Sequence, residues 1–179
     1  MAITCSISQS ILKSENCGYS LPQIVDVYLI DYNSVTVGKT DQPDGQDEIS
    51  GVTPATGASF YHIEPVKDST NFSDTLSSGS SGNKYRTVTV EFSVNQTYNK
   101  SMHAFIDGIS LGRYFAVVKT AEGNYIGLGR QTGVEASAAD LQGGTDNNGI
   151  TVTLTCNQAE SSMNLTDAAV EQLLQNLAD

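Results

Sequence analysis

The sequence has few basic side chains. Among its 179 residues, Lys and Arg together number 9, Asp and Glu number 20, and the formal net charge is -11. Proteins that bind nucleic acids attract them by neutralising phosphates with Lys and Arg, and anionic membrane surfaces attract the same side chains. The composition therefore argues against a nucleic-acid-binding protein and against a protein that binds an anionic membrane.

Long hydrophobic runs are also missing. A membrane-spanning helix needs about 20 consecutive apolar residues, and no run in the sequence approaches that length. The first 20 residues lack the basic segment followed by a hydrophobic one that marks a secretory signal. We therefore expect a soluble protein made in a cytoplasm. The length suits one domain of usual size, and we expect a single domain over residues 1–179.

Cysteine is scarce and follows no metal-binding spacing. The three cysteines are Cys5, Cys17 and Cys156, an odd number that cannot pair completely within the chain. We interpret them as small buried hydrophobic residues. A disulfide between Cys5 and Cys17 is the alternative, and it would require an oxidising compartment.

Catalytic motifs are missing as well. A nucleophilic Ser or Cys needs a base beside it, and the only histidines are His62 and His103. No serine lies in a Gly-x-Ser-x-Gly turn. The sequence therefore predicts a protein that is not an enzyme and that uses no cofactor.

No set of candidate metal ligands has a recognisable spacing. His62 with Glu64 would provide two ligands, but no further ligand follows at the usual interval. The acidic run at 41–48 has carboxylates enough for calcium, yet it does not alternate ligands as an EF-hand loop does. We expect no metal site, and calcium at the acidic run stays the alternative.

What the sequence does contain is strand-like alternation rich in Ser and Thr. Over 84–95, Val88, Val90 and Phe92 alternate with polar residues, and over 150–157 apolar residues alternate with Thr in the same way. This period of two predicts two strands with one buried and one outward face. Thr on the outward face keeps strand propensity high and offers hydroxyl groups without adding charge.

Further strands and two helices complete the prediction. The other strands are expected at 24–31, 35–38, 59–64, 112–119 and 124–130. Apolar residues at helical spacing predict a short helix over 102–109 and a C-terminal helix over about 166–178, with Thr166 as its N-cap. The predicted fold is mainly β, a β-sandwich or barrel of about seven to eight strands with one short flanking helix and the C-terminal helix.

Two segments are predicted to be long loops, at about 39–57 and 66–83. They are rich in Gly, Pro, Ser and Asp, and each is longer than the usual connection. Loops of this length are disordered or functional, and a loop that orders on a partner would need an anchor such as an aromatic side chain. The candidate subunit-interface residues are Asp41, Asp44, Asp47, Glu48 and Phe72.

The order of these segments resembles that of the tail tube (major tail) proteins of bacteriophages. The resemblance covers about residues 20–157 and includes Lys67-Asp-Ser-Thr-Asn-Phe-Ser-Asp74, the strand Tyr85-Arg-Thr-Val-Thr-Val-Glu-Phe92, the segment from Gly127 to Ser137 and the strand Gly149-Ile-Thr-Val-Thr-Leu-Thr155. The C-terminal helix does not match the family pattern. The resemblance implies a β-sandwich of which six copies form a ring, and rings that stack into a tube for genome delivery.

A tube of this kind needs an inner face. A negative, Thr-rich lumen would repel DNA and let it pass without specific binding. The candidate lumen residues are the outward positions of the two Thr-rich strands, namely Thr87, Thr89, Glu91, Ser93, Thr151, Thr153 and Thr155. An ordinary solvated sheet surface is the alternative. The resemblance implies other copies of the chain and other tail proteins as partners, no membrane, and a location in the virion tail after assembly in the host cytoplasm.

Four other functions remain open. A neck, tail-completion or capsid-decorating protein would use the same sandwich in one ring or a small oligomer. The tube protein of a contractile injection system would assemble similarly and transport proteins. A carbohydrate-binding sandwich is disfavoured because the sequence has no Trp and its tyrosines do not cluster. An enzyme is disfavoured because the catalytic motifs are missing.

Overall fold

The strands form where apolar and polar side chains alternate. The computed structural model describes residues 23–41, 47–95, 100–143 and 148–178. Within these ranges it contains eleven strands and two α-helices, which confirms the mainly β prediction. The elements are β1 (Ile24–Asp31), β2 (Val35–Lys39), β3 (Ile49–Pro54), β4 (Tyr61–Ile63), β5 (Asn71–Ser78), β6 (Lys84–Val94), α1 (Lys100–Leu111), β7 (Arg113–Thr120), β8 (Tyr125–Leu128), β9 (Val134–Gly143), β10 (Asn148–Gln158), β11 (Met163–Asn164) and α2 (Asp167–Gln175).

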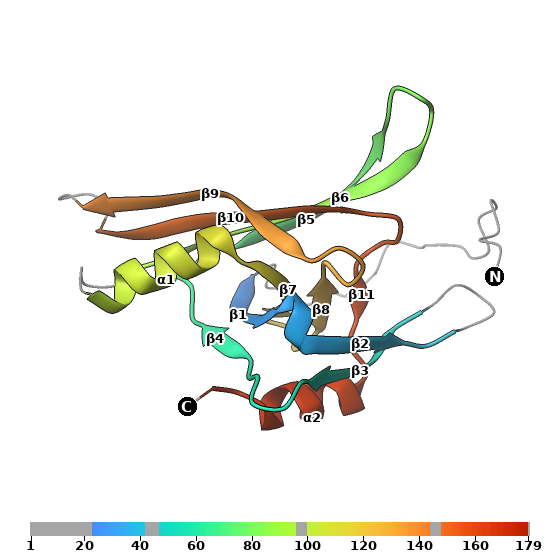
Figure 1. Ribbon diagram of the computed structural model, residues 1–179, viewed down its shortest axis with the longest axis horizontal. Helices are drawn as coiled ribbons and strands as arrows, with labels where there is room; N and C mark the ends of the chain where they lie inside the picture. Colours follow the sequence, from blue (N-terminus) through green and yellow to red (C-terminus); the bar gives the residue numbers. More distant parts are fainter. Residues whose placement is uncertain (1–22, 42–46, 96–99, 144–147, 179) are drawn as a thin grey trace, which may run out of the picture.

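The first layer is the antiparallel run β5, β6, β10 and β9, which lies uppermost in Figure 1. Val88, Val90 and Phe92 on β6 are fully buried, and β10 places its apolar residues directly opposite them. All of these side chains point to one side of the sheet, because residues that face each other across an antiparallel pair share a face. The other side of this layer is therefore left to the polar residues.

The second layer is built on β1 and β7, which pair along most of their length. Leu29 and Ala116 lie in the core shared with the first layer. Their neighbours Tyr28 and Phe115 lie in a second core on the opposite side. A strand that is buried on both faces reads as a continuous apolar run rather than as an alternation, and this explains the Phe-Ala-Val-Val sequence of β7.

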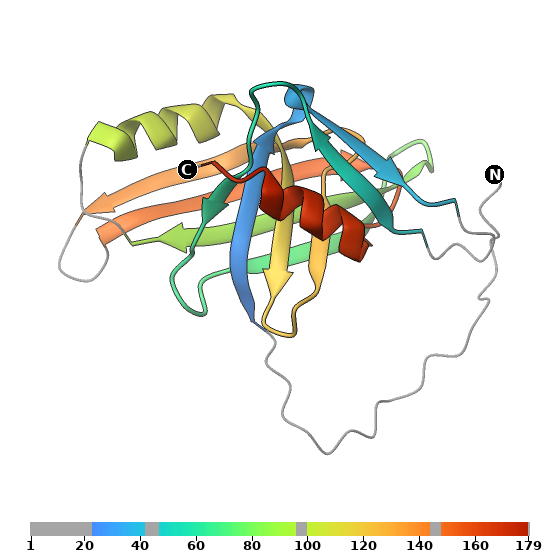
Figure 2. The same ribbon diagram turned by 90° about the horizontal axis from the view of Figure 1, so that it is seen from below.

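The third layer consists of the β2–β3 hairpin and helix α2, and it closes the second core (Figure 2). The Thr166 hydroxyl caps α2 by accepting a hydrogen bond from the backbone N–H of Ala169 at 3.3 Å, as the sequence predicted. Leu173 is fully buried against this core. The Gln172 amide oxygen accepts the backbone N–H of Val52 at 2.9 Å and fixes the helix to β3.

Helix α1 covers part of the inner side of the first layer beside β9 (Figure 2). Met102 and Ile109 are buried, while Phe105 and Ile106 are half-buried against the first core. These are the positions at helical spacing in the sequence, and the predicted helix is confirmed with wider bounds.

The two predicted loops are corrected by the structure. The segment 39–57 contains β3, and the segment 66–83 contains β5. Strand β5 carries polar residues on its outward face, and on the other side it has the half-buried Phe72 and Asp74 and the exposed Leu76, so it has little apolar periodicity. Its order comes from pairing with β6 over eight residue pairs. The Ser/Gly run that suggested a linker forms the turn of this hairpin.

Candidate functional site

The outward side of the first layer is the site that the sequence singled out, and we call it the polar face. The register places Thr87 opposite Asn157, Thr89 opposite Thr155, Glu91 opposite Thr153 and Ser93 opposite Thr151. All seven predicted lumen residues therefore lie together on the two central strands of this sheet. The edge strands extend the polar face with Asn71, Ser73 and Thr75 on β5 and with Glu135, Ala138 and Asp140 on β9.

The hydroxyl groups of the polar face bond mainly to one another. The Ser93 and Thr151 hydroxyls lie 2.9 Å apart, and the Thr89 and Thr155 hydroxyls lie 3.4 Å apart. The Thr87 hydroxyl donates to the Asn157 amide oxygen at 2.9 Å. Hydroxyls that are engaged within the sheet have less capacity left for a ligand. The hydroxyl groups at the centre of the polar face are thus hydrogen-bonded within the sheet, and Glu91 is the charged side chain among the face positions of its two central strands.

The ionised groups of the polar face are mostly acidic. Glu91 and Asp140 are exposed. Glu135 accepts a hydrogen bond from Arg113 Nε at 2.6 Å, so the guanidinium nearest to this face is neutralised by its partner. Among the face positions that the structure describes on these four strands, none is Lys. A phosphate backbone would meet no unpaired cation there and would be repelled.

Both edges of this four-stranded sheet have unpaired backbone groups. In the part of the chain that the structure describes, β5 pairs only with β6. Beyond β10, strand β9 pairs only through Val134 and Glu135, which meet the start of β7. Among the described residues, no strand pairs with the outer side of β9 from Ala136 to Gly143. Unpaired strand edges of this kind are templates for pairing with another chain.

The predicted interface residues do not come together at one place. Asp41, Asp47 and Glu48 flank the end of the β2–β3 hairpin, and Asp44 lies outside the described residues. The Asp47 carboxylate binds Lys39 Nζ at 2.8 Å and raises the pKa of Lys39. Phe72 lies on β5 and packs half-buried against the first core. Their role in subunit contacts stays a prediction, and Phe72 is not a free anchor in a loop.

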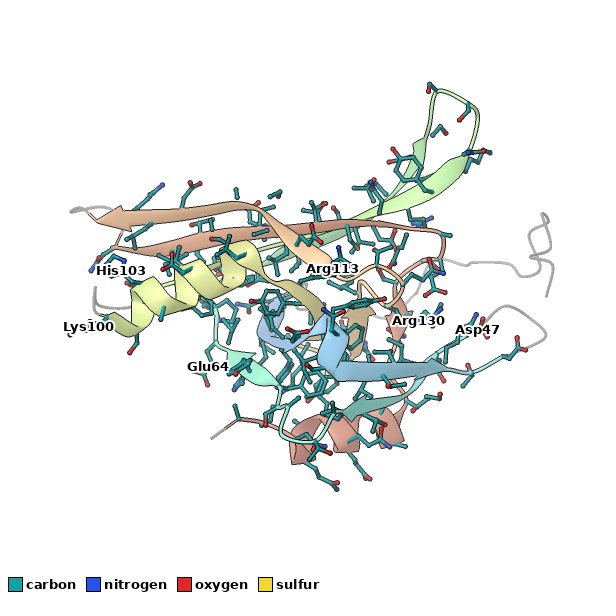
Figure 3. All side chains as sticks on the ribbon, viewed as in Figure 1. Asp47, Glu64, Lys100, His103, Arg113 and Arg130 are labelled. Carbon is teal, nitrogen blue, oxygen red and sulfur yellow. The ribbon has the colours of Figure 1, made fainter. Side chains whose placement is uncertain are left out.

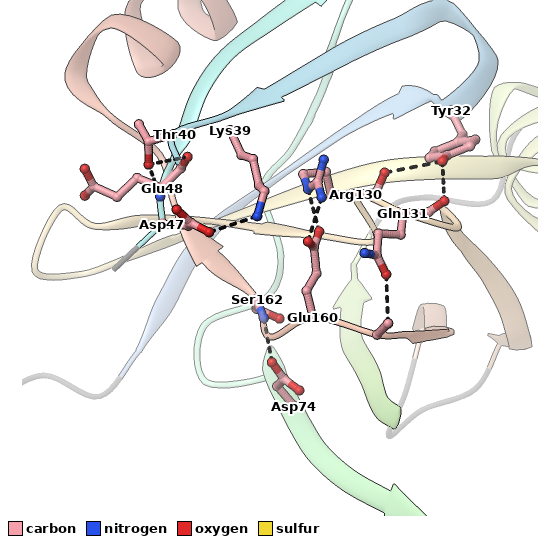
Figure 4. Close-up of polar contacts among 11 residues, drawn as sticks. Tyr32, Lys39, Thr40, Asp47, Glu48, Asp74, Arg130, Gln131, Glu160 and Ser162 are labelled. Carbon is pink, nitrogen blue, oxygen red and sulfur yellow. Dashed lines mark hydrogen bonds and ion pairs between the residues drawn. The ribbon is translucent and has the colours of Figure 1, made fainter. Parts of the chain in front are cut away.

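A polar cluster beside the site, shown in Figure 4, holds the segment after β10 in place. Asp74 accepts hydrogen bonds from Arg86 Nε at 2.5 Å and from the backbone N–H of Ser162 at 2.7 Å. Burial alone would raise the pKa of Asp74, but these donors outweigh it and hold the pKa below its usual value. Arg130 and Glu160 form a two-pronged ion pair at 2.5 and 2.6 Å. No pattern in the sequence predicts these contacts, because Arg130 and Glu160 are 30 residues apart and Asp74 and Ser162 are 88 residues apart.

A second cluster uses His62, which the sequence had left as a metal-ligand alternative. His62 Nε2 lies 2.9 Å from the Asp26 carboxylate, and Lys119 Nζ lies 3.2 Å from the same group. Burial would raise the pKa of Asp26, but the hydrogen bonds from both partners lower it overall. The His62 ring also stacks on Tyr28, with 4.9 Å between ring centroids. This cluster joins β4, β1 and β7 and has the features of a structural contact.

Metal-ligand residues stay dispersed. Glu64 lies beside β4 while His103 lies on α1, as Figure 3 shows. Among the described residues, no three His, Cys, Asp or Glu side chains are grouped so as to hold an ion. Cys156 is a buried free thiol whose pKa is raised by burial, and its place among apolar residues agrees with the interpretation as a small hydrophobe. Cys5 and Cys17 lie outside the described residues.

Comparison with known proteins adds no identification. No family model, curated protein or solved structure matches the chain. Among the helices that the structure describes, none is long and apolar enough to cross a bilayer. The function is therefore argued from the geometry of the polar face and its edges.

Proposed function

We propose that this protein is a virion structural subunit that assembles into rings, and that the rings stack as a phage tail tube. The observation that carries this proposal is the four-stranded sheet β5–β6–β10–β9. One of its faces is polar and acidic, and within the part of the chain that the structure describes both of its edges are unpaired over most of their length. A soluble monomer normally blunts such edges with charges, bulges or covering segments. The β9 ladder contains one register shift, whereas the β5 ladder contains none, so the β5 edge above all favours assembly.

The two open edges explain how a ring would close. Strand β5 at one edge differs from strand β9 at the other, so an edge-to-edge contact between copies is heterologous. A heterologous contact forms a closed ring when the rotation from copy to copy divides a full turn. Pairing β5 of one copy with β9 of the next would join the sheets into one continuous wall. The family resemblance supplies the expected number of six copies.

The polar face supplies the inner wall. Its central hydroxyls are engaged with one another, and its free charges, Glu91 and Asp140, are negative. DNA that passes along such a wall is repelled at short range and is not held by phosphate contacts. The partners are therefore other copies of the chain and other tail proteins, and DNA passes without specific binding. The protein acts without catalysis, in the virion tail after assembly in the host cytoplasm.

Electron microscopy of the purified protein across a range of concentrations tests the proposal, with light scattering on the same samples. We expect rings of uniform diameter that stack into tubes as the concentration rises. Rings that never stack would favour a neck, tail-completion or capsid-decorating component instead. A particle that stays monomeric at every concentration would contradict the proposal. Tubes made by a protein-translocating injection system would look alike, and genome neighbourhood separates the two.

Charged substitutions on the two edge strands test the edge-to-edge contact. Asn71 and Ser73 on β5 are exposed, and Asp140 is exposed on β9. Like charges that face each other across paired strands are destabilising. The double variant Asn71→Asp with Ser73→Asp should block ring formation, and adding Asp140→Lys should restore it. Asn71 also lies opposite Glu91 of the same subunit, so both variants should lose up to about 1 kcal/mol of stability, and circular dichroism melts set the temperature at which all variants are folded and are compared. Rings formed equally well by the double variant would contradict pairing between β5 and β9.

A further inference from the structure

One end of the first layer bears a hairpin that extends past its neighbours. Pairing between β5 and β6 continues to Ser78 opposite Lys84, whereas β10 ends at Gln158 opposite Arg86. The tip is therefore only two strands wide, and Figure 1 shows it standing clear of the layers. Leu76, in the last row that is covered by β10, is 62% exposed although it lies on the inward side of the sheet with Val88 and Val90. Most of this apolar residue is therefore open to solvent.

The opposite end of the same layer has a pocket of about 400 Å³. Its apolar lining is Val66, Val94 and Ile150, and the rest is small or polar, including Ser69, Asn148 and Thr151. Two hydrogen bonds hold the linker before β5 against β6 here, from the Val66 N–H to the Ser93 carbonyl at 2.8 Å and from the Ser93 N–H to the Ser69 hydroxyl at 3.3 Å. The pocket wall is thus anchored to the sheet, and Val66 is 40% exposed at its rim.

The two ends also differ in charge. In the hairpin beyond the last row covered by β10, residues 77–85 carry one ionisable side chain with a charge at neutral pH, the ammonium group of Lys84. Asp68 lies in the turn between the pocket residues Val66 and Ser69, and Asp140 lies opposite the pocket residue Thr151. Lys67 adds one positive charge beside these two carboxylates, so the sum of the three charges is negative. A cationic hairpin with an exposed Leu is complementary to a partly apolar pocket beside two carboxylates.

We propose that the hairpin of one copy docks into this pocket of a second copy, with Leu76 as the apolar anchor and Lys84 directed at the carboxylates. The two halves of the contact lie at opposite ends of one sheet. Such a head-to-tail contact builds an open-ended stack of copies when the operation from one copy to the next does not return to the first copy. The inference rests on the proposed function in that it supplies the contact between stacked rings. It adds which surfaces meet, namely the inward side of the hairpin and the pocket. Leu76 belongs to β5, but its side chain lies on the inward side of the sheet, whereas the ring contact uses the backbone groups along the edges of β5 and β9.

Selective disulfide formation between two single-cysteine proteins tests the contact. Leu76→Cys and Val66→Cys are made separately with Cys5 and Cys17 replaced by Ser, and Cys156 is buried and stays unreactive. After mixing and mild oxidation, we expect the mixed dimer to form at least tenfold faster than with Thr36→Cys, an exposed position on β2, in place of Val66→Cys. Equal rates with the two partners would overturn the proposal.

A charge on the anchor gives a second measurement. Leu76→Asp should abolish stacking and leave the fold unchanged, because the side chain is exposed in the free subunit. Leu111→Asp, at an 89% exposed position on α1, is the matched control and should stack as the wild type does. Normal stacking by Leu76→Asp would overturn the contact.

The outcomes also separate this inference from the proposed function. Tubes without the selective disulfide would overturn the hairpin contact and leave the tube proposal standing. The selective disulfide in a protein that never forms rings would support the contact and overturn the tube. A protein that neither associates nor forms the selective disulfide would overturn both.

Discussion

Asp74 is the residue that most clearly joins separate parts of the chain. Its carboxylate accepts from Arg86 on the neighbouring strand and from the backbone of Ser162, which lies 88 positions later. Only 12% of its side chain is exposed, so its hydrogen bonds are shielded from water and removing them is costly. The contact fixes the segment that leads from the first layer to β11 and α2.

We predict that Asp74→Asn lowers the free energy of unfolding at pH 7 by about 2 kcal/mol, the usual cost of losing a hydrogen bond to a charged group. The folded-state pKa of Asp74 lies below its usual value, while an unfolded Asp titrates near about 3.9. The stabilisation is therefore complete above the unfolded pKa and is lost as the pH falls through the folded pKa. Denaturant unfolding at pH values from 7 to below 4 measures both effects.

Asp107→Asn is the control, because Asp107 is exposed on α1. Exposed substitutions away from special contacts usually change stability by less than about 0.5 kcal/mol. The difference between the wild type and Asp74→Asn should shrink below pH 4, since protonation removes the same charge in the wild type. A difference that stays constant down to the lowest pH would contradict the assigned role of the carboxylate.

For single residues, the sequence predicts on which side of a strand a side chain lies better than it predicts which distant residue that side chain contacts. The alternation of Thr with Val placed Thr87, Thr89 and Thr151 correctly on one side of a sheet, because strand geometry alone sets which side chains share a face. It did not predict that Asp74 would meet Ser162. Such contacts depend on which distant segments lie beside each other in the fold. The spacing of apolar residues along a strand or a helix contains no information on that arrangement.

Among the elements, α2 shows how apolar residues at helical spacing contribute to the stability of a helix. Its apolar residues recur at helical spacing, and the structure buries Leu173 against β3 and the second core while Leu174, the next residue, stays 44% exposed. The helix is short, and isolated helices of this length are marginal in water. Its stability must therefore come from packing on the hairpin layer.

We predict that Leu173→Ala lowers the free energy of unfolding by about 2–5 kcal/mol, the range for removing a buried Leu side chain. Leu174→Ala is a matched control with the same chemical change on the same helix, and it should cost far less because Leu174 is partly in solvent. Urea unfolding of both variants gives the comparison. Equal losses would show that α2 does not pack as described.

The sequence predicted no strand at β3, β5, β9 or β11, and β5 and β9 are the longest of these four. Strand β9 contains several Ala residues and few β-branched ones, and β5 has the composition of a loop. Both are edge strands whose order comes from the ladders to β6 and β10. Local propensity is weak evidence for such strands, because pairing with a strong neighbour decides their conformation. The same two strands supply the open edges, so the elements hardest to predict carry the proposed assembly.

At the scale of the whole molecule, the three layers differ in how their faces are buried. The β1–β7 layer is buried on both sides and contributes to two cores, while the described positions of the polar face on the first layer are half-buried or exposed. The net charge of -11 disfavours close approach of many copies. Salt screens charges that lie more than about 8–10 Å apart at physiological ionic strength. Assembly should therefore rely on backbone pairing at the edges and on short-range contacts.

If the polar face lines the tube, assembly must hide it from large molecules. We predict that Glu91→Cys, with Cys5 and Cys17 replaced by Ser, reacts with both a small maleimide and a long polymer-linked maleimide in the free subunit. In assembled tubes it should keep its reaction with the small reagent, which diffuses along the lumen, and lose most of its reaction with the large one. The ratio of the two labelling rates, measured before and after assembly, is the readout.

Thr36→Cys in the same background is the control for this experiment. Thr36 is exposed on β2, in the hairpin layer on the other side of the molecule from the polar face. The ratio of its two labelling rates should not change on assembly, because the third layer, with the β2–β3 hairpin, would form the outside of the tube. The opposite pattern, with Thr36→Cys protected from the large reagent and Glu91→Cys open to it, would place the polar face outside and would contradict its proposed role as the wall of a DNA passage.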